Sequence, residues 1–105
     1  MYHVDITEPA EQDIQAAVKY IAEDLKNPIA ADRLLNNAVE AILSLEEMPL
    51  RYPLVDDEVI AGFGLRFFPV RNYLVFYSVQ EKAKTVLIER FIYGKRDWIT
   101  ILQGE

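Results

Sequence analysis

Basic and aromatic side chains alternate through the second half of the chain. The basic residues are Arg66, Arg71, Arg90, Lys95 and Arg96, and the tyrosines among them are Tyr73, Tyr77 and Tyr93. Guanidinium and ammonium groups bind phosphate, and tyrosine rings stack on nucleobases, so this mixture suits contact with RNA. Metal-free RNA cleavage would also need an activated 2′-hydroxyl, cations on the pentacoordinate phosphate and a proton donor for the leaving oxygen.

The residues present can fill only some of these catalytic roles. Arginines can supply the cations, and a tyrosine hydroxyl, with an ordinary pKa of about 10, can donate a proton but is a poor base. No serine or cysteine nucleophile stands near a base in the sequence, and no histidine or acidic residue is an obvious base for a 2′-hydroxyl. Composition therefore favours a protein-binding basic sheet over a nuclease and leaves both open.

Charge is divided unevenly along the chain. Residues 62–105 contain seven Lys or Arg against four Asp or Glu, whereas residues 1–61 contain four against thirteen. The overall net charge of −6 works against nonspecific affinity for nucleic acid. A nucleic-acid ligand is still compatible with the sequence only because the second half of the chain is basic.

The length and composition restrict the class of protein. A chain of 105 residues predicts a single domain over residues 1–105, and 51% hydrophobic with 27% charged residues is typical of a globular fold. With no cysteine and one histidine, we expect no disulfide, no metal and no cofactor. The sequence shows neither a membrane-spanning apolar run nor a secretory leader, so we expect a cytoplasmic protein without a membrane partner.

The first half predicts a strand followed by two helices. Residues 2–6 alternate apolar and polar side chains, as a half-buried strand does. Apolar stripes at helical spacing predict one helix that begins at a Thr7 cap and ends at Lys26, and a second that runs from an Asn27 cap to before Pro49. Because the connection is so short, the two helices should form an antiparallel hairpin.

The second half predicts three strands in an antiparallel meander, over residues 65–70, 73–79 and 85–93. The last two are apolar on both faces and should be central strands. Simple alternation places Ile92 on the same face as Val86 and Ile88.

Two connecting segments complete the prediction. Prolines, glycines and an acidic triplet predict a loop over residues 49–64. Asp97 is expected to cap a short closing helix.

Together these elements predict an α+β fold. It consists of an N-terminal strand, an antiparallel two-helix hairpin and a three-stranded antiparallel meander. They form a four-stranded sheet with the hairpin packed on one face, because the sheet is the only available partner for the apolar stripes of the hairpin.

The order of several short motifs resembles the RelE/ParE superfamily of toxins from type II toxin–antitoxin, or plasmid-stabilisation, systems. The motifs are VDITEPA at residues 4–10, YIA at 20–22, LEEMP at 45–49, RYP at 51–53, LR at 65–66, YLVFY at 73–77, and the stretch at 90–98. The resemblance covers essentially the whole chain, and the order and spacing of the motifs make it specific.

The resemblance implies a cytosolic toxin that arrests bacterial growth until a cognate antitoxin wraps and neutralises it. RelE-like members cleave mRNA in the ribosomal A site without metal, whereas ParE-like members poison DNA gyrase and lack that active site. A third interpretation is a degenerate toxin that retains only antitoxin binding. The expected partners are therefore an antitoxin and either the ribosome with mRNA or DNA gyrase, and the expected assembly is a homodimer or a toxin–antitoxin hetero-oligomer.

The resemblance also assigns roles to individual residues. Arg66 and Arg96 match basic positions of the RelE-like nucleases, and with Tyr73 they form the predicted catalytic set. Tyr73 itself stands where a RelE-like arginine would begin the third strand, and Leu102 stands near the expected position of a catalytic tyrosine. The predicted binding residues are Arg71, Tyr77, Tyr93 and Lys95.

Arg90 could serve either a structural ion pair or the functional surface. Because it shares a face of the predicted strand with Ile88, we favour the structural role.

Overall fold

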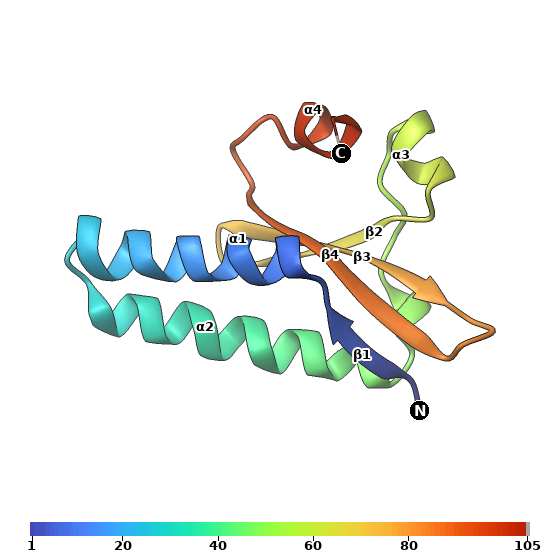
Figure 1. Ribbon diagram of the computed structural model, residues 1–105, viewed down its shortest axis with the longest axis horizontal. Coiled ribbons are helices and arrows are strands. Elements are labelled where there is room, and N and C mark those ends of the chain that lie inside the picture. Colours follow the sequence, from blue (N-terminus) through green and yellow to red (C-terminus); the bar gives the residue numbers. More distant parts are fainter. Residues whose placement is uncertain (105) are drawn as a thin grey trace.

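The structure is a computed structural model that describes residues 1–104. Its helices and strands are, in chain order, β1 His3–Ile6, α1 Glu8–Lys19, the π-helical turn η1 Tyr20–Asp24, α2 Pro28–Leu43, the 3₁₀ turns η2 Ser44–Glu46 and η3 Pro49–Arg51, α3 Glu58–Gly62, β2 Arg66–Val70, β3 Tyr73–Gln80, β4 Thr85–Tyr93 and α4 Trp98–Gln103. Figure 1 shows α1 and α2 side by side as a hairpin, with α3 and α4 lying away from it. None of the helices in the described part of the chain is long and apolar enough to cross a membrane.

Both long helices begin at the predicted caps. Thr7 Oγ1 accepts a hydrogen bond from Ala10 N at 3.4 Å, and Asn27 Oδ1 accepts one from Ala30 N at 3.1 Å. A proline stands in the first turn of each helix, where its missing N–H costs no helical bond. The hairpin is therefore specified by local sequence at both starting points.

The first helix ends in a wide π turn. In η1 the Leu25 N–H donates to Tyr20 O at 3.0 Å, a spacing of five residues instead of the four of an α-helix. This turn sets the direction of the Tyr20, Ile21 and Leu25 side chains at the tip of the hairpin.

The sheet has the strand order β1-β4-β3-β2. Strands β2, β3 and β4 form the predicted antiparallel meander, and β3 and β4 are central, as predicted. Strand β1 joins parallel to β4, with His3 opposite Thr85, so the sheet is mixed. The crossover from β1 through the hairpin and the meander to β4 gives this parallel pairing.

A β-bulge in β4 changes which side chains share a face. Tyr77 is opposite Ile88 and Phe76 is opposite Arg90, so Glu89 is left as an extra residue. Beyond this point the predicted alternation is wrong. Phe91 packs with Ile88 under the hairpin, whereas Ile92 packs on the other face. Because successive strand residues point to opposite faces, one inserted residue moves every later side chain of β4 to the other face of the sheet.

Each face of the sheet has its own apolar core. The core under the hairpin contains residues from α1, α2 and the three strands β2, β3 and β4, including Ile14, Leu34, Phe68, Val75, Tyr77 and Ile88. The second core contains Val55, Ile60, Leu65, Phe76, Ile92 and Leu102. The predicted hairpin-on-sheet packing is confirmed, and α3 with its preceding loop covers the opposite face together with α4.

The predicted loop over residues 49–64 is wrong in part, because η3 and α3 lie within it. Asp57 caps α3, since its Oδ1 accepts hydrogen bonds from Val59 N and Ile60 N, both at 3.1 Å. Ile60 is fully buried in the second core, and this tertiary contact stabilises a helix too short to form alone. The predicted cap of α4 is confirmed, because Asp97 Oδ1 accepts from Thr100 N at 3.3 Å.

Candidate functional site

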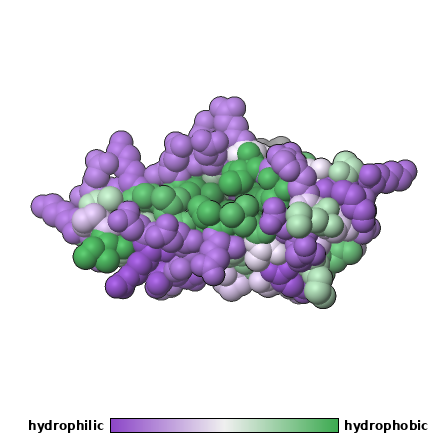
Figure 2. Space-filling view, turned by 90° about the horizontal axis from the view of Figure 1, so that it is seen from below, coloured by the Kyte–Doolittle hydropathy of each residue, from purple (hydrophilic) through white to green (hydrophobic). Residues whose placement is uncertain are grey.

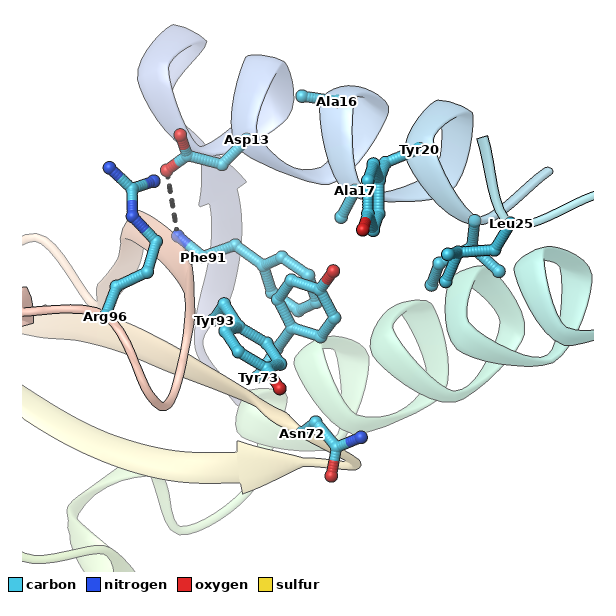
Figure 3. Close-up of a pocket in the computed structure, with 11 residues that line it drawn as sticks. Asp13, Ala16, Ala17, Tyr20, Leu25, Asn72, Tyr73, Phe91, Tyr93 and Arg96 are labelled. Atoms are coloured by element: carbon cyan, nitrogen blue, oxygen red, sulfur yellow. Dashed lines mark hydrogen bonds between the residues drawn. The ribbon is translucent and has the colours of Figure 1, made fainter. Parts of the chain in front are cut away.

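A groove lies between α1 and the adjoining ends of β3 and β4 (Figure 3). Its main cavity has a volume of about 620 Å³. The lining residues are Asp13, Ala16, Ala17, Tyr20, Ile21, Leu25, Asn72, Tyr73, Phe91, Tyr93 and Arg96. The two alanines explain why the groove is hollow, because longer side chains at these α1 positions would fill it.

Aromatic rings form the floor of the cavity. Tyr73 begins β3 opposite Tyr93 near the end of β4. The Tyr73 ring stacks on Phe91 with centroids 4.9 Å apart, and Tyr93 meets Tyr73 edge to face at 5.5 Å. Such pairs hold the rings in defined positions, so the floor is a rigid apolar surface.

A second cavity continues the groove under the hairpin tip. Its volume is about 290 Å³, and it shares Ile21, Leu25, Asn72 and Tyr73 with the first cavity. Arg33 of α2 and Arg71 of the β2–β3 turn line its walls, whereas Arg96 lines the first cavity. The groove therefore has an apolar middle with arginine side chains toward each end.

Asp13 is the one carboxylate among the residues that line these two cavities. Its Oδ2 accepts hydrogen bonds from Arg90 Nε at 2.7 Å and from Phe91 N at 3.0 Å, and its Oδ1 accepts from Arg90 Nη2 at 3.1 Å. Figure 3 shows Asp13 above Phe91, with Arg96 on the same side of the cavity. Because the Asp13 carboxylate already has these donors, it fits a positioning role better than that of a base.

The structure brings together some of the residues predicted from sequence. Tyr73, Tyr93 and Arg96 line the first cavity, and Arg71 lines the second. Lys95 is exposed beside Arg96 and lines neither cavity.

Arg66 and Tyr77 lie at the other end of the β2–β3 ladder, where they are opposite each other. Arg66 Nη1 donates to Tyr52 O at 2.7 Å and to Leu50 O at 3.3 Å. The Tyr77 hydroxyl is buried and donates to Pro49 O at 2.6 Å. Four strand residues, about 13 Å, separate Tyr77 from Tyr73. Arg66 is thus remote from Tyr73 and Arg96.

The pKa values of the Tyr73 and Tyr77 hydroxyls are both raised by burial. Burial raises the pKa of Tyr73, and the neighbouring Tyr93 and Tyr20 hydroxyls raise it further. Burial also raises the pKa of Tyr77, against the opposing positive charge of Arg66. Both hydroxyls remain protonated at neutral pH, so they can donate hydrogen bonds but do not act as bases.

The groove residues that were not predicted as site residues include Asp13, Ala16, Tyr20 and Arg33. Tyr20 offered a signal, because it is a large aromatic residue placed off the apolar stripe of its helix. The ion pair of Arg90 with Asp13 confirms the favoured structural role of Arg90. Within residues 1–104, no three His, Asp or Glu side chains lie together as metal ligands would.

The family model of the ParE toxin of type II toxin–antitoxin systems, parDE, matches residues 4–98. The chain is similar to a chain in a solved structure of the chromosomal ParDE toxin–antitoxin system from P. aeruginosa, with a TM-score of 0.71, 20% identity, and coverage of 89% of this chain and 96% of that one. It is also similar to a chain in the toxin–antitoxin complex RelBE2 from Mycobacterium tuberculosis, with a TM-score of 0.63, 24% identity, and coverage of 88% and 96%. At these identities the two structures show a shared fold. No curated protein sequence matches the chain significantly. The match over residues 4–98 shows that this chain belongs to the ParE toxin family, within the RelE/ParE superfamily that its motifs predicted.

Proposed function

We propose that this protein arrests growth by binding a protein target, as the gyrase-poisoning ParE-like toxins do, and that an antitoxin neutralises it. The observation that carries this proposal is the separation of Arg66 from the groove. Its guanidinium holds the Leu50 and Tyr52 carbonyls at the far end of the β2–β3 ladder, whereas Tyr73 and Arg96 line the cavity at the near end.

A ribonuclease site needs its cations and its proton donor around one phosphate. Catalytic groups act within about 3 Å of the reacting atoms, or through one bridging water. Arg66 does not line the cavity that holds Tyr73 and Arg96, and its guanidinium is held by the Leu50 and Tyr52 carbonyls at the far end of the ladder. A toxin that works as a protein ligand does not need this convergence, and membership of the ParE family supports the same interpretation.

The groove is the proposed docking site for the antitoxin. Its floor is apolar and aromatic, and Arg33 and Arg71 lie toward one end while Arg96 lies toward the other. A disordered segment with apolar side chains between acidic ends would complement this pattern and could fold as a helix on binding. The resulting assembly would be a toxin–antitoxin hetero-oligomer.

Ribosome-dependent mRNA cleavage is the second candidate function. One observation favours it, because Tyr73, Tyr93 and Arg96 line the same cavity, where the rings could stack on a base while the arginine binds a phosphate. This arrangement would require Tyr73 and Arg96 to act without Arg66.

A short induction in a bacterial host tests the proposed target. We expect growth arrest, an SOS response and intact mRNA by primer extension, and purified toxin should inhibit gyrase in a supercoiling assay. Growth arrest with codon-phased breaks in translated mRNA would instead establish the ribonuclease. Full growth with abundant folded protein would mean that the chain retains only antitoxin binding.

The antitoxin site is tested with the cognate antitoxin and single arginine variants. Arg96→Ala should weaken antitoxin binding roughly tenfold, because it removes one cationic end of the groove. The matched control is Lys82→Ala, which removes an exposed charge from the β3–β4 turn. If wild type and Arg96→Ala bind the antitoxin with equal affinity, the antitoxin binds at a surface other than this end of the groove.

A further inference from the structure

The outer face of α2 carries an apolar stripe that the described part of the chain leaves exposed. Leu35, Val39 and Leu43 follow one another at four-residue spacing, so they lie along one side of the helix. Their exposed fractions are 38%, 45% and 51%. Figure 2, which views the molecule from the α2 side, shows apolar surface running along the molecule between hydrophilic borders.

This stripe is distinct from both the core and the groove. The inward face of α2 buries Ala31, Leu34, Ala38 and Ile42. The stripe residues line neither groove cavity, and the groove side of α2 is marked by Arg33. The exposed part of the stripe therefore belongs to neither the buried core nor the groove.

Acidic side chains stand at both ends of the stripe. Asp32 precedes Leu35 by three residues on α2, and Glu46 follows Leu43 by three residues in η2, just past the end of the helix. About 22 Å separates the two positions, at 1.5 Å of rise per residue in α2 and about 2.0 Å in η2. The last turn of α2 contains no basic residue, and the Arg51 guanidinium donates to Ser44 O at 3.4 Å and to Glu47 O at 2.7 Å just beyond the helix end.

The charge pattern disfavours a second copy of this chain as the occupant. An antiparallel pairing that sets Leu35 against Leu43 would also set Asp32 against Glu46. A parallel pairing would set each carboxylate against its own copy. Both arrangements bring like charges together beside the apolar contact, which costs binding free energy.

We propose that this face of α2 binds an amphipathic basic helix of another protein. The partner helix would present apolar side chains every three or four residues, with Lys or Arg at both ends of that stripe to meet Asp32 and Glu46. Its contact is of the helix-to-helix kind, in which apolar anchors give affinity and flanking charges fix register. This binding goes beyond the proposed function, because it uses neither the groove nor the antitoxin.

The probe for this proposal is a labelled helical peptide with three stripe leucines and Lys at both ends. A second peptide carries Glu in place of each of those Lys. In fluorescence anisotropy with the full chain, the Lys peptide should bind at least roughly tenfold more tightly than the Glu peptide. The double reversal Asp32→Lys with Glu46→Lys should make the chain bind the Glu peptide more tightly than the Lys peptide. A surface that binds by nonspecific hydrophobic contact would show no such reversal.

Val39→Asp places a charge in the centre of the stripe and should reduce affinity for the Lys peptide by at least roughly tenfold. Val59→Asp is the matched control, because Val59 is an exposed apolar residue of α3 outside the stripe. Circular dichroism establishes that each variant remains folded. Equal affinity for the two peptides, or insensitivity to Val39→Asp, would overturn the proposal. A wild-type dimer that Val39→Asp dissociates, seen by sedimentation, would also overturn it in favour of a second copy.

Discussion

Asp13 of α1 binds Arg90 of β4 through both of its carboxylate oxygens. The two contacts measure 2.7 and 3.1 Å, and Asp13 Oδ2 also accepts the Phe91 N–H at 3.0 Å. The Arg90 and Asp13 side chains are only 16% and 19% exposed. The pair fixes the middle of α1 to β4 directly after the bulged residue Glu89, and Asp13 lines one end of the groove.

Loss of this ion pair should lower stability. Asp13→Ala leaves the Arg90 charge and the Phe91 N–H without their carboxylate, so we expect the free energy of unfolding to fall by about 3 kcal/mol. Urea denaturation at neutral pH measures the change. Gln12→Ala, an exposed neighbour on α1, should change it by less than about 0.5 kcal/mol. Equal stability of the two variants would contradict a structural role for the pair.

Arg66 should behave as a structural residue. Arg66→Ala removes the donors to Tyr52 O and Leu50 O, and we expect a loss of about 1–2 kcal/mol in the free energy of unfolding. Growth arrest per folded molecule should persist under the proposed function. The measurements are a thermal melt and a growth curve normalised to soluble protein. An unchanged melt together with complete loss of growth arrest would indicate catalysis instead.

The stability of the fold should fall as pH rises above about 10, the ordinary pKa of tyrosine. Because burial raises the pKa of Tyr77 in the folded state, the unfolded chain loses this proton first. Alkaline pH then favours the unfolded state. The stability that protonated Tyr77 contributes is fully present below the tyrosine pKa of the unfolded chain, and it is lost as the pH rises through the pKa of Tyr77 in the folded state. Tyr77→Phe should flatten the decline above about pH 10, measured by urea denaturation, and Tyr73 should account for part of the remaining slope. An unchanged slope would contradict the assignment to Tyr77.

Filling the groove should block antitoxin binding without unfolding the toxin. Ala16 lines the main cavity yet is exposed, so Ala16→Trp can place its ring in the groove at little cost to the core. We expect antitoxin affinity to fall by at least roughly tenfold while the free energy of unfolding stays within about 0.5 kcal/mol. Gln15→Trp adds the same ring at an exposed neighbour that lines neither cavity. If both variants bind the antitoxin like wild type, the groove is not its docking site.

Local sequence predicted the elements whose causes are local. Thr7, Asn27 and Asp97 cap helices because each side chain reaches an N–H within three residues. The hairpin and the central position of β3 and β4 were likewise predicted, since apolar periodicity reports which sides of an element must be buried. The same patterns carried the family resemblance.

Features that depend on distant partners could not be predicted in this way. The bulge at Glu89 follows from the pairing of β4 with β3, and α3 depends on the burial of Ile60 in the second core. The periodicity of a short stretch of sequence reveals neither the pairing with β3 nor the second core against which Ile60 packs.

The sequence by itself determined the family, the order of the elements and the types of residue that could bind a ligand. Only the tertiary structure decided that Tyr73, Tyr93 and Arg96 share a cavity while Arg66 lies at the opposite end of the ladder. It also decided that Arg90 pairs with Asp13, 77 residues away. The physical reason is that a functional site depends on distances between side chains, and strand register and helix packing set those distances across segments far apart in the chain.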